Sequence, residues 1–181
     1  MPSRSATLPR PFATAALTGL SDDELLDRLT VGHLSRAAYW RLWETAMTDN
    51  SAVRRGLRHR DPRVRAACAQ ILDHFLDAAA LAEIIDCLGD DHPRVRVWAL
   101  HTLGCDRCKQ GACRPGESVF VPEAVRVLAE DPSPLVRAAA ATTLGQSASA
   151  RQPGVAKALV AARDGDPDRY VRKTAARFAR A

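Results

Sequence analysis

Three cysteines lie close together in the middle of the chain, and thiolates can bind a metal ion or exchange electrons. Two residues separate Cys105 from Cys108, and Cys113 follows after four more. A Cys-x2-Cys turn brings two thiolates to one Zn2+ at bond lengths of about 2.3 Å. His101, one helical turn before Cys105, is the expected fourth ligand. The sequence therefore predicts a structural zinc site at Cys105, Cys108, Cys113 and His101, where the metal would order a loop poor in apolar residues.

Two other interpretations of this segment stay open. Cys105 and Cys108 could form an exchanging dithiol with Cys113 as a spare, which would make the protein a thiol-dependent enzyme. The three thiols could also be inert in a reducing compartment. Cys87 and His92 are weaker candidate ligands, and an iron–sulfur cluster fits the spacing poorly.

The composition limits the class of protein. The chain has 181 residues, of which 46% are hydrophobic and 26% charged, so it suits a globular fold rather than a disordered one. Its formal charge is +5, with 26 basic residues of which only three are lysine. Such an arginine bias is typical of a GC-rich genome and is weak evidence for an acidic partner. Prolines and arginines interrupt residues 1–20, which are expected to be a flexible N-terminal tail without a secretory signal, in a bacterial protein of the cytoplasm.

An internal repeat organises most of the remaining chain. Four Val-Arg pairs recur at intervals of 31, 41 and 35 residues, each preceded by an Asp/Pro turn. Apolar residues follow three, four and eight positions after each of the first three valines, which places them on one helix face. Another apolar helix precedes each turn. These first helices are expected near residues 53–58, 81–88, 121–128 and 155–162.

The Asp-Pro-x-Val-Arg motif, the helix-pair period and the Leu-Gly endings at Gly104 and Gly145 resemble HEAT repeats, especially the short bacterial kind also found in phycobilisome lyases. The resemblance covers residues 50–181. It implies a right-handed all-α solenoid, in which stacked helix pairs bury the apolar faces that single pairs cannot. We expect a helical cap at 21–48, opened by a capping box of Ser21 and Glu24, and four repeats at 49–181. A Cys-rich insertion is expected at 104–120.

The arginines of the four Val-Arg pairs should line up on the second helices. The family resemblance implies that each pairs with a turn aspartate, and Asp61, Asp91, Asp131 and Asp166 are the expected acceptors. The alternative is a basic stripe that follows phosphates, extended by a basic first repeat. The candidate partner-binding residues are therefore Arg54, Arg55, Arg58, Arg65, Arg96 and Arg137.

These patterns together favour a non-catalytic scaffold that holds a protein partner on the concave face formed by the second helices. One alternative is a nucleic-acid binder related to HEAT-like DNA glycosylases, with Tyr39, Trp40 and Trp43 beside the basic repeat. The other is a thiol-dependent or lyase-like enzyme. No catalytic constellation supports an enzyme, because the histidines outside the cysteine segment have no nucleophile or carboxylate at a recognisable spacing.

Overall fold

The computed structural model describes residues 15–105 and 115–179. Within these ranges the chain forms ten α-helices and three short 3-10 helices, and no strand. The 3-10 helices are η1 (Ala15–Leu17), η2 (Cys87–Gly89) and η3 (Ala148–Arg151). The α-helices are α1 (Asp22–Arg28), α2 (Gly32–Ala46), α3 (Ser51–Gly56), α4 (Pro62–Leu72), α5 (Ala78–Asp86), α6 (Pro93–Gly104), α7 (Glu117–Glu130), α8 (Pro134–Gln146), α9 (Pro153–Gly165) and α10 (Arg169–Ala176). None of the helices in the described ranges has the length and apolar character needed to cross a membrane.

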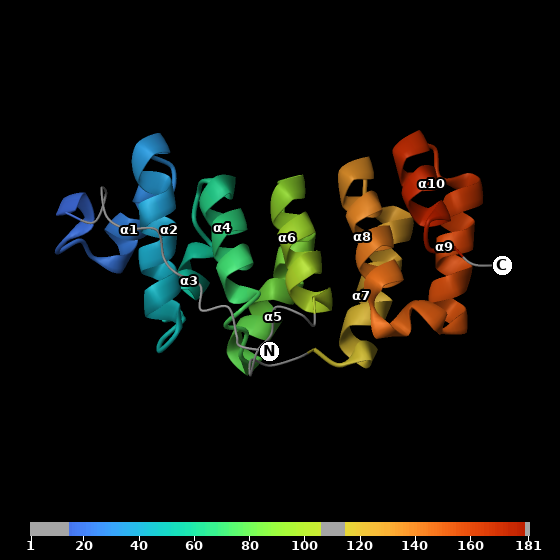
Figure 1. Ribbon diagram of the computed structural model, residues 1–181, viewed down its shortest axis with the longest axis horizontal. Coiled ribbons are helices and arrows are strands. Elements are labelled where there is room, and N and C mark those ends of the chain that lie inside the picture. The colour runs from blue at the N-terminus through green and yellow to red at the C-terminus, as the bar shows by residue number, and fades with distance from the viewer. Residues whose placement is uncertain (1–14, 106–114, 180–181) are drawn as a thin grey trace, which may run out of the picture.

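The helices stack as pairs into an α-solenoid, as the sequence predicts. The four pairs are α3/α4, α5/α6, α7/α8 and α9/α10, and the second helices α4, α6 and α8 stand side by side along the molecule (Figure 1). The valine of each Val-Arg pair is fully buried between the helices. These core valines are Val64, Val95, Val136 and Val171.

Local sequence explains where the second helices begin. Proline occupies the first turn of α4, α6 and α8, where its missing N–H is not needed. The side chains of Asp61, His92 and Asp168 accept hydrogen bonds from backbone N–H groups at the starts of α4, α6 and α10. The polar turns thus satisfy donors that a helix leaves open at its N-terminus.

Two helices, α1 and α2, precede the first repeat, and packing starts earlier in the chain than either of them. The capping box of Ser21 and Glu24 is present at the start of α1. The ring centroid of Trp43 in α2 lies 4.9 Å from that of Phe75, so the aromatic helix packs on the first repeat. Leu17 is only 2% exposed, and therefore the expectation of a flexible tail up to residue 20 is wrong at its C-terminal end.

The helix after the cysteine segment is longer than the repeat pattern suggests. It begins at Glu117, within the predicted insertion at 104–120. Phe120, in the first turns of α7, is buried and lies where a side chain on Gly104 would point. Burial of this aromatic ring accounts for the extension of α7 into the predicted loop.

Candidate functional site

The second helices are joined by an arginine–aspartate ladder, in which an arginine of one repeat forms two hydrogen bonds with an aspartate of the next. The pairs are Arg65–Asp90 (2.7 and 2.8 Å), Arg96–Asp131 (2.7 and 2.8 Å) and Arg137–Asp166 (2.8 and 3.0 Å). The remaining Nη1 of each arginine donates to the carbonyl oxygen six residues earlier, at 2.8 Å for both Arg96 and Arg137. Each guanidinium therefore holds its own turn and the next repeat together.

The ladder is buried, which fixes its role. The side chains of Arg96 and Asp131 are 10% and 5% exposed. Hydrogen bonds to Asp131 raise the pKa of Arg96 above its ordinary value. Burial alone would raise the pKa of Asp166, but the hydrogen bonds from Arg137 lower it overall. A buried carboxylate that has lost its arginine would be strongly destabilising, so these charges serve the fold.

The aspartate register differs from the prediction in the first two repeats. In the second repeat the main acceptor is Asp90, although Asp91 also contacts Arg65. Asp61 pairs with Arg63 at 2.7 Å and caps α4, so it is not part of the ladder. His59 holds the corresponding place in the first repeat, where its Nδ1 accepts from the Asp61 N–H at 3.0 Å. The prediction is confirmed for Asp131 and Asp166, which lie six residues before Arg137 and Arg172. It misses the first two repeats because the residues six positions before Arg65 and Arg96 are His59 and Asp90.

The basic cluster of the first repeat is also paired within the chain. Glu83 of α5 accepts hydrogen bonds from Arg54 at 2.8 Å and from Arg58 at 3.1 Å. Arg55 lies 3.4 Å from the Asp23 carboxylate of α1. All six arginines predicted to bind a partner therefore contact a carboxylate of the same chain. These pairs reduce the positive electrostatic potential that the arginines would present to a phosphate backbone.

The exposed side chains of the second helices are arranged differently. The turn position two residues before the arginine of each Val-Arg pair lies at the start of a second helix. In the four repeats it is occupied by Arg63, Arg94, Leu135 and Tyr170. We call this set the turn edge. Leu135 and Tyr170 are 50% and 60% exposed, whereas core apolar residues are nearly inaccessible. The turn edge thus has an arginine in each of the first two repeats, of which Arg63 is paired with Asp61, and a large apolar side chain in each of the last two.

Part of the predicted zinc site comes together at the other ends of α4 and α6. His101 and Cys105 lie close to each other, and the third member of their cluster is Asp73, which was not among the predicted ligands. One donor atom from each of the three lies within 4.8 Å of the others. Cys108 and Cys113 lie outside the described residues. Cys87 and His92 do not belong to this cluster.

Asp73 could have been found from the repeat register. It follows Leu72 at the position where the next two repeats carry Gly104 and Gly145. A Cβ atom at Gly104 would meet Thr143 at 2.2 Å, and one at Gly145 would meet Phe178 at 2.1 Å. The glycines therefore allow close stacking of the following repeat, and an aspartate in their place is a departure that calls for an explanation.

The other two described cysteines are core residues, as predicted. Cys68 is fully buried and Cys87 is 8% exposed. Burial raises the pKa of the Cys68 thiol far above its ordinary value, and burial followed by the charge of Asp90 raises that of Cys87 to about 11. Neither thiol is suited to act as a thiolate near neutral pH.

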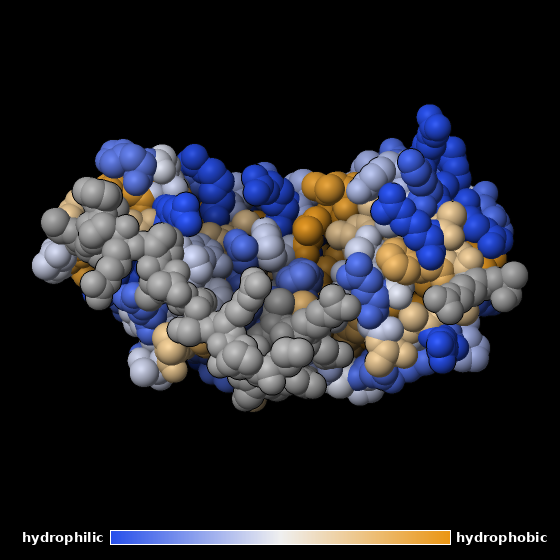
Figure 2. All heavy atoms as spheres, viewed as in Figure 1, coloured by the Kyte–Doolittle hydropathy of each residue, from blue (hydrophilic) through white to orange (hydrophobic). Residues whose placement is uncertain are grey.

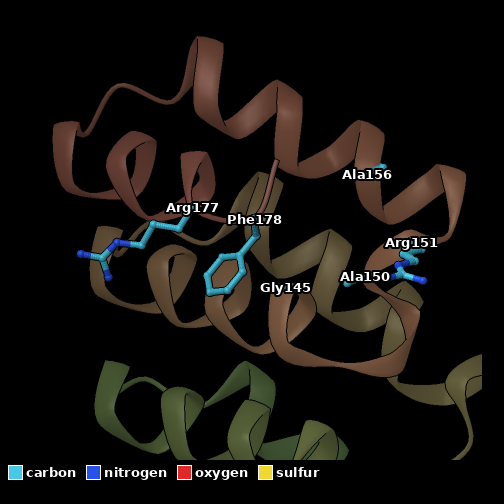
Figure 3. A pocket seen from close by; sticks show the side chains of 6 residues that line it. All are labelled: Gly145, Ala150, Arg151, Ala156, Arg177 and Phe178. Atoms are coloured by element: carbon cyan, nitrogen blue, oxygen red, sulfur yellow. The ribbon is translucent and has the colours of Figure 1, made fainter. Parts of the chain in front are cut away.

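A pocket of about 290 Å3 opens at the C-terminal end of the solenoid. Phe178 covers Gly145 at its centre, while Arg151 and Arg177 extend from opposite sides (Figure 3). A ligand site usually has polar groups that converge on one point. These two arginines do not converge, so the pocket is best understood as the stacking of the last helix on α8.

The fold and the repeat register agree with the comparison against protein families. A family model described as HEAT repeats matches residues 50–115 and 111–179. No curated protein matches the chain. The two matched ranges cover the four helix pairs and the arginine–aspartate ladder. The chain belongs to the HEAT-repeat family.

Proposed function

We propose that this protein is a non-catalytic scaffold that binds a protein partner across its second helices, α4, α6, α8 and α10. The turn edge is the observation that carries the proposal. Its four members hold one register position in successive repeats, and two of them are large apolar side chains at least half exposed. Aromatic side chains such as that of Tyr170 are enriched among the anchors of protein interfaces.

The charge of the turn edge suggests the chemistry of the partner. Arg94 is exposed, and it takes part in none of the ion pairs found among the described residues. A segment with an acidic residue toward Arg94 and apolar residues toward the last two repeats would complement it. Hydrophobic and hydrophilic residues are interspersed on this face of the molecule, and hydrophilic residues are also prominent near α10 (Figure 2).

The nucleic-acid alternative has lost its main support. It rested on Arg54, Arg55, Arg58 and the ladder, and each of these arginines has a carboxylate partner in the chain. Tyr39 and Trp43 pack against the core rather than forming an exposed stacking platform. The protein-binding proposal accounts for the exposed apolar residues, which a phosphate-binding stripe does not need.

We retain the zinc proposal for the end of α6. Two of its four predicted ligands, His101 and Cys105, lie together. The metal would be structural, since it would fix the start of the segment that leads to α7. Such a site would hold the edge of the scaffold without adding chemistry of its own.

Site-specific photo-crosslinking in the host cell tests the scaffold proposal. A photoreactive phenylalanine analogue is placed at Leu135 or Tyr170, and at Arg126 or Lys157 on the first helices of the same two repeats as matched controls. We expect a discrete adduct from the turn-edge positions and none from the controls. The adduct is identified by mass spectrometry and the captured protein is produced in pure form.

A titration with that purified protein completes the test. Leu135→Glu and Tyr170→Glu should each weaken binding at least about tenfold, because each places a charge at an apolar contact. Lys157→Glu should leave binding unchanged. Adducts formed equally from α7 and α9, or unchanged affinity in both turn-edge variants, would overturn the proposal. Tight binding of a duplex oligonucleotide with a steep salt dependence would favour the alternative instead.

A further inference from the structure

The cluster at the ends of α4 and α6 joins two repeats rather than one loop. Asp73 is the C-cap residue of α4, His101 lies in the last turn of α6, and Cys105 is the C-cap residue of α6. Their donor atoms come from consecutive repeats, although Asp73 and His101 are 28 residues apart in sequence. An interaction that joins these three residues therefore also joins the first repeat to the second.

Asp73 is unusually placed for a carboxylate. Its residue is 2% exposed, although aspartate is rarely fully buried unless it is paired or binds a metal. His101 Nε2 lies 3.3 Å from Asp73 Oδ2, and His74 Nε2 lies 3.9 Å from the same oxygen. Among the described residues, two imidazoles therefore lie beside this buried carboxylate.

Aromatic rings hold these imidazoles in place. The ring centroid of Trp98 lies 5.4 Å from that of His101, in an edge-on arrangement. Trp43 lies 4.4 Å from the His74 ring. Packing of this kind restricts ring rotation, so that the donor atoms are positioned in advance.

The separations suit a tetrahedral ion. Two oxygen or nitrogen ligands of zinc lie about 3.3 Å apart when each bond is about 2.0–2.1 Å long. The Asp73–His101 pair already has this separation, at 3.3 Å. The Cys105 thiol lies within 4.8 Å of both, so a shift of about 1 Å would bring it to a bond length of about 2.3 Å.

We propose that Asp73, His101 and Cys105 form a binding site for a zinc-class divalent ion that links the first two repeats. This inference rests on the zinc part of the proposed function and changes its ligand set, because a helix-end carboxylate of the neighbouring repeat takes the place of one loop cysteine. On binding, Cys105 gives up its thiol proton to solvent and bonds to the metal as the thiolate, while neutral His101 bonds through Nε2. The donor set of one carboxylate, one imidazole and one thiolate is within the range that zinc accepts.

Metal titration of the reduced full-length protein, first stripped with a chelator, tests the site. Zn2+ affinity is measured by competition with a chromophoric chelator, and Co2+ is used as a spectroscopic probe of thiolate ligation. We expect one ion per chain and a thiolate-to-cobalt charge-transfer band that disappears in Cys105→Ser. Asp73→Asn and His101→Gln should each weaken Zn2+ binding at least about tenfold.

Matched variants separate ligation from folding. His33→Gln and Cys87→Ala remove residues of the same types outside the cluster and should leave Zn2+ affinity unchanged. Circular dichroism checks that each variant is folded. If Asp73→Asn does not fold, His101→Gln serves in its place, since the His101 side chain is 42% exposed. Zn2+ should also raise the melting temperature of the wild type and fail to raise that of His101→Gln.

The outcomes distinguish the two levels of the proposal. No binding of Zn2+ or Co2+ would overturn both the zinc proposal and the ligand set. A second outcome is Zn2+ binding that needs Cys105 but is unchanged in Asp73→Asn. If Asp73→Asn does not fold, the same result is sought in His101→Gln. This outcome would overturn only the link between repeats, and the metal would then be assigned to the loop cysteines. Loss of binding in the Asp73, His101 and Cys105 variants, with both controls unchanged, would establish the site.

Discussion

The first and second repeat interfaces are alike at one end and different at the other. At the N-terminal ends of the second helices both have the same ion pair, Arg65–Asp90 in the first interface and Arg96–Asp131 in the second. At the C-terminal ends, the side chains of Phe120 and Thr143 pack closely against Gly104 in the second interface. The first interface has Asp73 at that position, with His101 facing it.

This contrast separates what the fold requires from what it does not. A ladder that recurs at every described interface is a requirement of stacking. The glycine found at the same position in two repeats is also a requirement of stacking, because a Cβ atom there would collide with the next repeat. The aspartate at the first interface leaves a buried carboxylate that stacking alone does not call for, and such a departure is the place to look for function.

Breaking the ladder should have the largest effect. Arg96→Met removes a buried cation and leaves Asp131 unpaired, so we expect a loss of about 3–5 kcal/mol in the free energy of unfolding. Arg63→Met, at an exposed pair with Asp61, should cost at most about 1 kcal/mol. Urea denaturation measures both. Equal effects would contradict the distinction between buried and exposed pairs.

Filling the glycine position should have the next largest effect. Gly104→Ala places a methyl group 2.2 Å from Thr143, so we expect a loss of about 1–3 kcal/mol through overpacking. Gly154→Ala in α9 meets nothing within 4 Å and should be neutral or slightly stabilising. Thermal and urea denaturation compare the two. A neutral Gly104→Ala would show that close stacking is not needed at the second interface.

Acid should weaken the ladder from the aspartate side. The pKa values of Asp90 and Asp166 are lowered in the folded protein, so the folded state binds these protons less tightly than the unfolded state. The stabilisation is therefore present above the ordinary aspartate pKa of about 3.8 and is lost as the pH falls below it. Stability measured against pH should decline below about pH 4. Asp166→Asn should reduce the steepness of that decline, and an unchanged slope would contradict the assignment.

Thiol labelling disturbs the protein least of these tests, and it should show a clear difference in alkylation rate between the folded and the denatured protein. Cys68 and Cys87 are buried with raised pKa values, so their alkylation at neutral pH should be slow in the folded protein. In denaturant all five cysteines should react at comparable rates. Mass spectrometry assigns each site. Fast labelling of Cys68 in the folded state would contradict its place in the core.

The sequence was sufficient to predict the solenoid because its main cause is local and periodic. The apolar spacing after Val64, Val95 and Val136 specifies helix faces, and the proline turns specify where the helices start. The ladder register was only partly predicted. The Asp-Pro motif identifies Asp131 and Asp166, but Asp90 lies three residues before its proline, and only its distance of six residues from Arg96 identifies it. Asp73 was not predicted, because its neighbour His101 comes from another repeat and no local motif joins them.

X-ray absorption spectroscopy at the zinc edge of the zinc-loaded protein is the most direct test of the specialised first interface. With Asp73 and His101 as ligands, the first coordination shell contains at least two oxygen or nitrogen atoms beside sulfur, at distances of about 2.0–2.1 Å. In Asp73→Asn, the oxygen and nitrogen contribution should fall. A shell of three sulfurs and one nitrogen, unchanged in that variant, would show that the cysteine segment binds the metal by itself and would contradict the account.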